Sequence, residues 1–184
     1  MNSLTLLAIA VVVVVFWIYS IYASVIRKRN KAQEAFSSID VQLKKRYDLI
    51  PNILTIAQKY MEHERGIMEE VTKLRTQVMG LSSNFENIDR KIALDGEIAK
   101  KMGQIMVAVE NYPQLKADQT MITAMQTYNE VEEHIAAARR FYNSAANELK
   151  NAVEIFPSSL FARMLNIKTV DFIKATEQER QQIK

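Results

Sequence analysis

An N-terminal run without a single charged side chain is the feature that most constrains this chain. The first charged residue is Arg27, and the mainly apolar segment from Leu4 to Ile26 is 23 residues long. About 20 such residues are enough for an α-helix to cross the hydrocarbon core of a bilayer. Aromatic rings that favour the membrane interface stand near the end of the run: Trp17, Tyr19 and Tyr22. The sequence therefore predicts a transmembrane anchor over residues 1–26.

Basic residues directly follow the run and form what we call the basic collar: Arg27, Lys28, Arg29 and Lys31. A cleaved signal peptide is disfavoured, because its basic residues would precede a shorter apolar part. A buried core helix is disfavoured as well, because the run has no polar face. The positive-inside rule then places the N-terminus outside and the rest of the chain in the cytoplasm. In this orientation the collar faces anionic lipid of the bilayer, which attracts basic residues.

After the collar, apolar residues recur at three- and four-residue steps, which is typical of amphipathic helices. Only 4 Gly and 3 Pro interrupt the chain. The first predicted helix continues to Val78, is kinked just before Pro51 and ends at Gly80. The other predicted helices span about 87–109, about 116–155, 158–164 and 169–184. Ser83 and Glu86 have the spacing of a capping box for the helix that begins near residue 87. Ser158 or Ser159 can cap the helix over 158–164, and Asn166 can end it in the left-handed conformation.

Short connections between long helices require antiparallel packing. The predicted fold class is therefore all-α, with an N-terminal transmembrane helix followed by an antiparallel, four-helix-like bundle of long helices with coiled-coil character. The predicted domains are the anchor over 1–26, a bundle over 27–168 and a polar C-terminal helix over 169–184. That last helix is expected to fill the fourth position of the bundle.

The residues that carry most enzyme chemistry are scarce. There is no Cys, and the two histidines, His63 and His134, lack the spacing of a zinc or di-iron site. No glycine-rich phosphate loop or nucleophile elbow occurs. The 24 basic and 21 acidic residues are too balanced to indicate nucleic-acid binding. We expect no catalytic residue, no metal and no cofactor.

The stretch from Asp40 to Asn52 concentrates both charge signs around Pro51. One interpretation is a solvated helix face next to a structural kink, where Asp48 and Asn52 bond backbone groups that the proline leaves without a partner. The other is a binding surface for a partner or a second copy. Its candidate residues are Asp40, Lys44, Lys45, Arg46, Asp48 and Asn52.

Three blocks of the sequence resemble the LemA family of bacterial membrane proteins: Arg29–Asn52, Glu110–Ala117, and Ile135–Asn143 followed by Phe156–Leu160. The resemblance implies an inner (cytoplasmic) membrane protein with an outside N-terminus and a cytoplasmic bundle of long helices, without an established enzymatic activity or cofactor. A similar protein occurs among magnetosome-associated proteins, which points to membrane organisation. The chain departs from the family pattern at Asn166-Ile167, where Gly-Phe is expected, and at His134, where Asn is expected.

Two functions remain open from the sequence. In the first, the protein is a non-enzymatic scaffold whose anchored helices associate into a homo-oligomer at the membrane. In the second, it is an adaptor that docks onto another membrane protein, such as a protease or a signalling complex. An enzyme or a metal carrier is the least favoured of the three classes.

Overall fold

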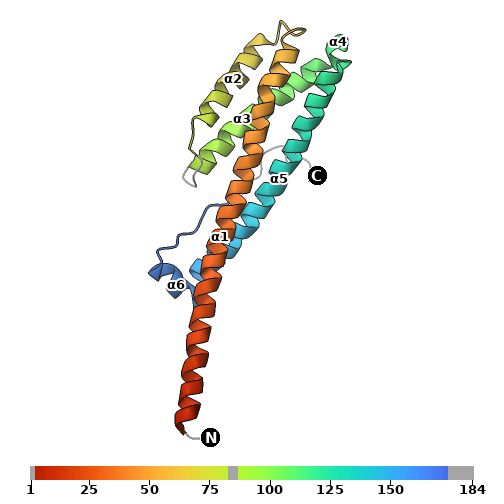
Figure 1. Cartoon of the computed structure of the whole chain (residues 1–184). Helices are drawn as coiled ribbons and strands as arrows, with labels where there is room; N and C mark the ends of the chain where they lie inside the picture. The colour runs from red at the N-terminus through yellow and green to blue at the C-terminus, as the bar shows by residue number, and fades with distance from the viewer. Residues whose placement is uncertain (1–2, 83–86, 174–184) are drawn as a thin grey trace, which may run out of the picture. The chain divides into compact units, whose positions relative to one another are not determined.

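The computed structural model describes residues 3–82 and 87–173, and within these ranges all regular structure is helical (Figure 1). This confirms the all-α class. The predicted capping box at Ser83 and Glu86 lies outside the described residues. The helices are α1 (Ser3–Ala57), α2 (Arg65–Met79), α3 (Ile88–Val109), α4 (Pro113–Lys116), α5 (Gln119–Glu154) and α6 (Ser158–Met164).

The chain forms two compact units. The first lies within Met1–Phe36 and Phe141–Phe172, and the second within Ser37–Arg140 and Ile173–Lys184. Among the described residues, α1 contains the one stretch long and apolar enough to cross a membrane, with a mean hydropathy of 2.7. None of that stretch is buried. Its apolar side chains therefore have no protein partner within the chain.

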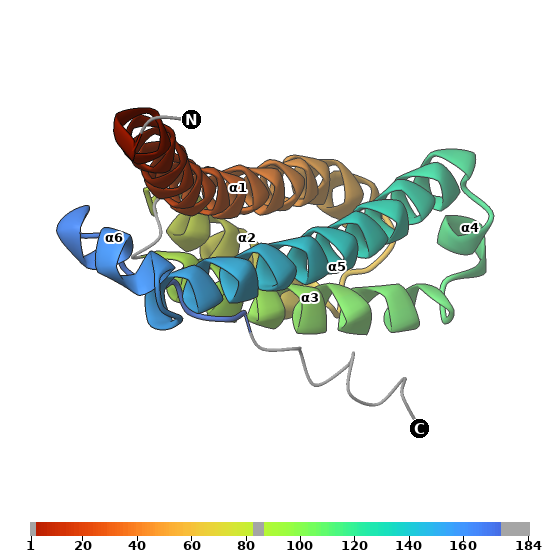
Figure 2. The same cartoon turned by 90° about the horizontal axis from the view of Figure 1, so that it is seen from below.

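The second unit is a four-helix bundle with short connections. The last turns of α1 lead upward in Figure 1, α2 returns, α3 leads upward again, and α5 descends after the short α4. Helices α3 and α5 run alongside each other, as Figure 2 shows. Fully buried Ile, Leu and Met side chains fill the centre, and each contributes about 1.5–3 kcal/mol to stability. The largest are Ile39, Leu43, Ile50, Ile53, Met61, Met68, Ile98, Met102, Ile105 and Leu115.

The fourth described helix of this bundle is α2, which the sequence predicted as the end of the first helix, and residues 174–184 of the C-terminal segment expected in that position lie outside the described residues. The single helix expected up to Val78 is broken by turns over residues 58–64. Met68, Val71 and Val78 are buried on α2, which packs against α3. Folding back lets this apolar stripe reach the core, whereas a straight helix would leave it without a partner. The turn was missed because it contains neither Gly nor Pro.

Pro51 lies inside α1, and the helix continues past it to Ala57. A proline has no backbone N–H, so the carbonyl four residues earlier, that of Tyr47, loses its usual donor. Arg75 on α2 replaces that donor, since its Nε donates to the Tyr47 carbonyl at 2.6 Å. The sequence predicted that Asp48 and Asn52 would bond the backbone groups left free by Pro51. That prediction is wrong for the Tyr47 carbonyl, because its donor is Arg75 on the neighbouring helix.

The predicted third helix begins at Gln119, later than expected. Asp118 caps it, because its Oδ1 accepts from the backbone N–H groups of Thr120 and Met121 at 2.8 and 3.1 Å. These bonds lower the pKa of the Asp118 carboxyl, with that to Met121 as the largest cause. The cap fixes the point at which the chain turns from α4 into α5.

At the end of α6, the expectation for Asn166 is confirmed: its φ is 50°, and Ile167 N–H donates to the Ala162 carbonyl at 2.9 Å. The predicted caps are wrong, because the Ser158 hydroxyl instead donates to the Ile155 carbonyl and no side chain caps the helix start. Residues 169–173 are not helical, unlike the prediction for 169–184. The rest of that segment lies outside the described residues.

The Arg75 bond predicts a specific coupling with Pro51. Arg75→Met should lower the free energy of unfolding by about 1.5–3 kcal/mol, because it leaves the Tyr47 carbonyl without a charged donor. In a Pro51→Ala background, where the alanine restores a backbone N–H, the same change should cost clearly less. Urea titrations of the full chain in mild detergent, followed by circular dichroism, measure both.

Asp48→Asn is the control for this cycle, because Arg75 also lies 3.9 Å from Asp48 in an exposed ion pair. Exposed pairs contribute only about 0–1 kcal/mol. If Arg75→Met lowers the free energy of unfolding equally with and without Pro51, then Arg75 does not replace the backbone N–H that the proline lacks.

Candidate functional site: a charge cluster buried in the bundle

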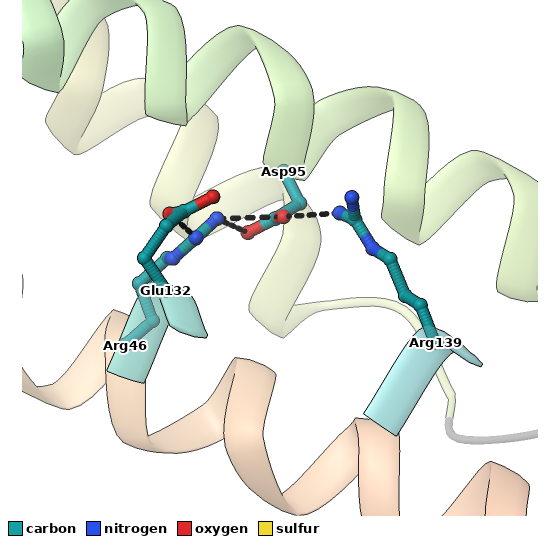
Figure 3. Close-up of polar contacts among 4 residues, drawn as sticks. All are labelled: Arg46, Asp95, Glu132 and Arg139. Carbon is teal, nitrogen blue, oxygen red and sulfur yellow. Dashed lines mark hydrogen bonds and ion pairs between the residues drawn. The ribbon is translucent and has the colours of Figure 1, made fainter. Parts of the chain in front are cut away.

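Four charged side chains converge inside the second unit, and we call them the buried charge cluster: Arg46, Asp95, Glu132 and Arg139 (Figure 3). Arg46 on α1 and Asp95 on α3 are both completely buried. Nη1 of Arg46 donates to both carboxylate oxygens of Asp95, at 2.7 Å each. Arg139 on α5 donates to the same carboxylate at 3.2 Å, so Asp95 lies between two guanidinium groups.

Glu132 on α5 completes the cluster by pairing with Nη2 of Arg46. Its side chain is 44% exposed, so this edge of the cluster opens to solvent while Arg46 and Asp95 do not. Two positive and two negative groups leave the cluster without net charge. This neutrality is needed, because an uncompensated charge in a protein interior is strongly destabilising.

The local helix pattern places these residues in the core. On α3, Asp95 falls between Lys91 and Ile98 on the buried face, at steps of four and three residues. On α5, Arg139 occupies the same face as the buried Ile135 and Tyr142. A charged residue in an apolar stripe is therefore the sequence signal for this cluster. Sequence reasoning missed the roles of Asp95, Glu132 and Arg139.

A second ion pair joins the same two helices one turn away along α3. Lys91 Nζ lies 2.7 Å from Oδ1 of Asp40 on α1, and the Lys91 side chain is 7% exposed. Arg46 and Asp95 form the other contact between α1 and α3. Two charged contacts in the same order along both helices fix α1 and α3 as parallel neighbours in one register.

An aromatic ring lies against the Arg46 guanidinium. The Tyr128 ring centroid lies 5.5 Å from the guanidinium carbon, within the range of a cation–π contact. Burial raises the pKa of Tyr128 to about 12, although the positive charge of Arg46 acts in the opposite direction. Burial also raises the pKa of Tyr47, and the charge of Asp95 raises it further.

The arrangement supports structure better than catalysis. The Asp95 carboxylate is bound by two guanidinium groups from neighbouring helices, which is the arrangement of a structural ion-pair network. His63 lies in the turn after α1 and His134 lies on α5, both exposed. Among residues 3–82 and 87–173, His, Asp and Glu side chains form no group of three that could hold a metal.

The candidate interaction residues separate into two groups. Arg46 is directed into the core and cannot belong to an exposed surface, and Asp40 is paired with Lys91. The exposed members of the stretch are Lys44, Lys45, Asp48 and Asn52. Burial corrects the expectation for Arg46, because its helical position coincides with the apolar stripe. A binding role for the exposed members remains a prediction.

The basic collar belongs to the first unit. Arg27 and Arg29 are exposed, and Lys28 is half-buried. Lys31 forms an ion pair with Glu148 on α5, with Nζ and Oε1 2.7 Å apart. Two of the collar's cations, Arg27 and Arg29, are thus exposed, while Lys31 also connects α1 to α5.

Comparison with known proteins identifies the family. The model of the LemA family matches residues 35–184. The chain belongs to the LemA family. Protein LemA of Metamycoplasma hominis is 25% identical to this LemA-family chain over 156 residues, covering 84% of the chain and 69% of the relative. With its exposed apolar N-terminal helix, this member of the family is a membrane-associated protein.

Magnetosome proteins are also similar to this LemA-family chain. Magnetosome protein MamQ 2 of Paramagnetospirillum magneticum is 21% identical over 194 residues, covering 92% of the chain and 71% of the relative. Magnetosome protein MamQ of Magnetospirillum gryphiswaldense is 21% identical over 192 residues, with coverages of 91% and 71%. These similarities extend over most of the chain.

Removing the central carboxylate should destabilise the bundle strongly. Asp95→Asn leaves two guanidinium groups without their shared partner, so we expect the free energy of unfolding to fall by about 3–5 kcal/mol. Glu97→Gln, an exposed change on the same helix, is the control and should alter it by no more than about 0.5 kcal/mol. Equal effects of the two variants in urea titrations would contradict this role.

Tyr128 predicts how stability depends on alkaline pH. Its pKa is about 12 in the folded protein and about 10 when unfolded, so the folded state keeps the proton more tightly. Stability due to this difference is present below pH 10 and is lost as the pH rises to about 12. Tyr128→Phe should therefore show a smaller loss of stability across this window, measured by thermal unfolding at each pH. Identical profiles would contradict the shift.

Proposed function

We propose that this protein is a membrane-anchored, non-enzymatic helical bundle that serves as a structural scaffold by self-association at the membrane. The observation that carries the proposal is the buried charge cluster. Ionisable groups that converge in the bundle neutralise one another instead of facing a substrate. The ion pairs of the cluster fix the positions of α1, α3 and α5 relative to one another. The outer faces of these helices can then act as a surface of constant shape.

The proposed setting is the inner (cytoplasmic) membrane, with a single crossing, the N-terminus outside and the bundle in the cytoplasm. The exposed cations of the basic collar, Arg27 and Arg29, support this orientation because positive residues are retained on the cytoplasmic side. The proposal of a scaffold is further supported by the relatives named as magnetosome proteins, since those names refer to the magnetosome and not to a reaction.

Two features support self-association. The membrane stretch of α1 is entirely unburied, so its whole circumference is available to lipid or to another copy. On the second unit, Lys44 and Lys45 are exposed on α1 beside Asp48, so one helix face offers both charge signs to a neighbour. Anchoring also confines copies to a surface and raises their effective concentration, which makes weak contacts sufficient.

The mass of the full chain in gentle detergent tests this proposal. We expect light scattering on a sizing column to show a discrete assembly of several copies. Lys44→Glu with Lys45→Glu should reduce the mass, because like charges would then meet across the contact. Arg90→Glu with Lys100→Glu, the same charge change at exposed sites of α3, is the control and should leave the assembly intact.

A strictly monomeric wild-type protein would contradict the scaffold and favour the second candidate, an adaptor. That candidate rests on the same exposed residues, which then bind another membrane protein such as a protease or a signalling complex. A partner should co-purify with the wild type and be lost from the Lys44→Glu, Lys45→Glu variant at unchanged helicity. If nothing co-purifies, the adaptor function has no support.

A further inference from the structure

The first unit carries an exposed apolar surface on and around α6. The side chains of Phe156 and Met164 are 78% and 76% exposed, and those of Ile155 and Leu160 are 58% and 55% exposed. Leu160 and Met164 are four residues apart, so they project from one face of the helix. Exposed apolar side chains grouped in this way mark a site of interaction with a partner or a membrane.

This surface lies level with the end of the membrane segment. Val25, in the last turn of the uncharged run, is completely buried, whereas the apolar side chains from Leu4 to Tyr19 are 42–78% exposed. Slightly further along α1, Lys31 forms an ion pair with Glu148, which belongs to the other part of the same unit, Phe141–Phe172. Figure 1 shows α6 and the end of α5 at the height of α1 where its colour changes from red to orange.

The charges among residues 155–170 are of the sign that attracts anionic lipid, and the exposed Glu154 and Asp171 border this stretch. Residues 155–170 contain no Asp or Glu, while Arg163 and Lys168 are exposed cations. The exposed Arg27 and Arg29 of the basic collar follow the membrane segment directly. Apolar residues flanked by cations are the composition of segments that lie in the plane of a membrane interface and attract anionic lipid.

The polypeptide on both sides of the surface is held in place. Ala162 is completely buried on the inner face of α6, and the left-handed Asn166 ends the helix. Beyond it, the Tyr142 hydroxyl donates to the Asp171 carbonyl at 3.2 Å, and Lys150 Nζ lies 5.8 Å from the centre of the Phe172 ring. These contacts keep the opposite face of α6 directed outward.

We propose that α6 and the residues before it form a second membrane contact, in which Phe156, Leu160 and Met164 insert among the lipids at the interface. Lipid is the occupant that fits, because the surface lies at the height where the proposed membrane segment of α1 ends and the charges within residues 155–170 are all positive. The inference rests on α1 crossing the membrane. It does not depend on self-association or on which side the bundle occupies.

The absence of cysteine in this chain makes the position of α6 directly measurable. Met164→Cys in the full chain, labelled with a fluorophore and reconstituted into vesicles with anionic lipid, places a probe on the surface. We expect quenching by nitroxide groups on the lipid chains and little quenching by aqueous iodide. Val13→Cys is the control within the membrane, and Val107→Cys, exposed on α3, is the aqueous control.

Each result at these three positions has a distinct meaning. Iodide quenching at position 164 with lipid quenching at position 13 overturns the second contact and leaves the anchor intact. Absence of lipid quenching at position 13 overturns both the contact and the proposed anchor. A probe at position 164 that is shielded from both quenchers indicates that protein covers α6, and this also overturns the proposal.

A charge placed in the surface gives an independent test. Adding Phe156→Asp and Leu160→Asp to the labelled Met164→Cys chain should at least halve its quenching by lipid nitroxides and raise its quenching by iodide. Val107→Asp in the same labelled chain is the matched control, and quenching should not change. Circular dichroism of each variant should show unchanged helicity. Lipid quenching that survives both Asp substitutions overturns the insertion.

Discussion

The bundle depends on one carboxylate, that of Asp95, shared between guanidinium groups from two other helices. Stripes of Ile, Leu and Met can pack in more than one register, because each turn of a helix offers a similar apolar surface. A buried charge removes this freedom, since a shift of one turn would leave Arg46 or Arg139 without its partner in the interior. The pair between Lys91 and Asp40, one turn away along α3, also requires this register, because a shift would separate the buried Lys91 from Asp40.

This constraint connects the core to the proposed function. A protein that acts by presenting a surface must hold its helices in one arrangement, and in this bundle a change of register would separate the buried partners Arg46 and Asp95. The exposed charges of Lys44 and Lys45 then occupy defined positions relative to the buried Arg46 on the same helix. Basic residues thus have two roles on α1: the buried Arg46 fixes the packing of the helices, and the exposed Lys44 and Lys45 belong to the proposed contact surface.

Much of the fold could be predicted from the sequence, because long apolar stripes and scarce Gly and Pro leave few alternatives to long helices. The long apolar helix at the N-terminus, the end of α3 and the left-handed Asn166 at the end of α6 all follow from local signals. The turn over 58–64 could not be predicted, since it has no turn residue and is imposed by the need of α2 to bury Met68 and Val71. The cluster could not be predicted either, because pairing across α1, α3 and α5 is a tertiary property.

Pro51 has a consequence for which segments can be neighbours during folding. A helix with all its backbone bonds intact accepts any apolar neighbour, but α1 carries at Tyr47 a carbonyl that only a suitable side chain can satisfy. Arg75 meets that requirement, and a segment without a donor at this height would bury the carbonyl without a partner. The proline thus makes the pairing of α1 with α2 depend on a donor at this height, which Arg75 supplies.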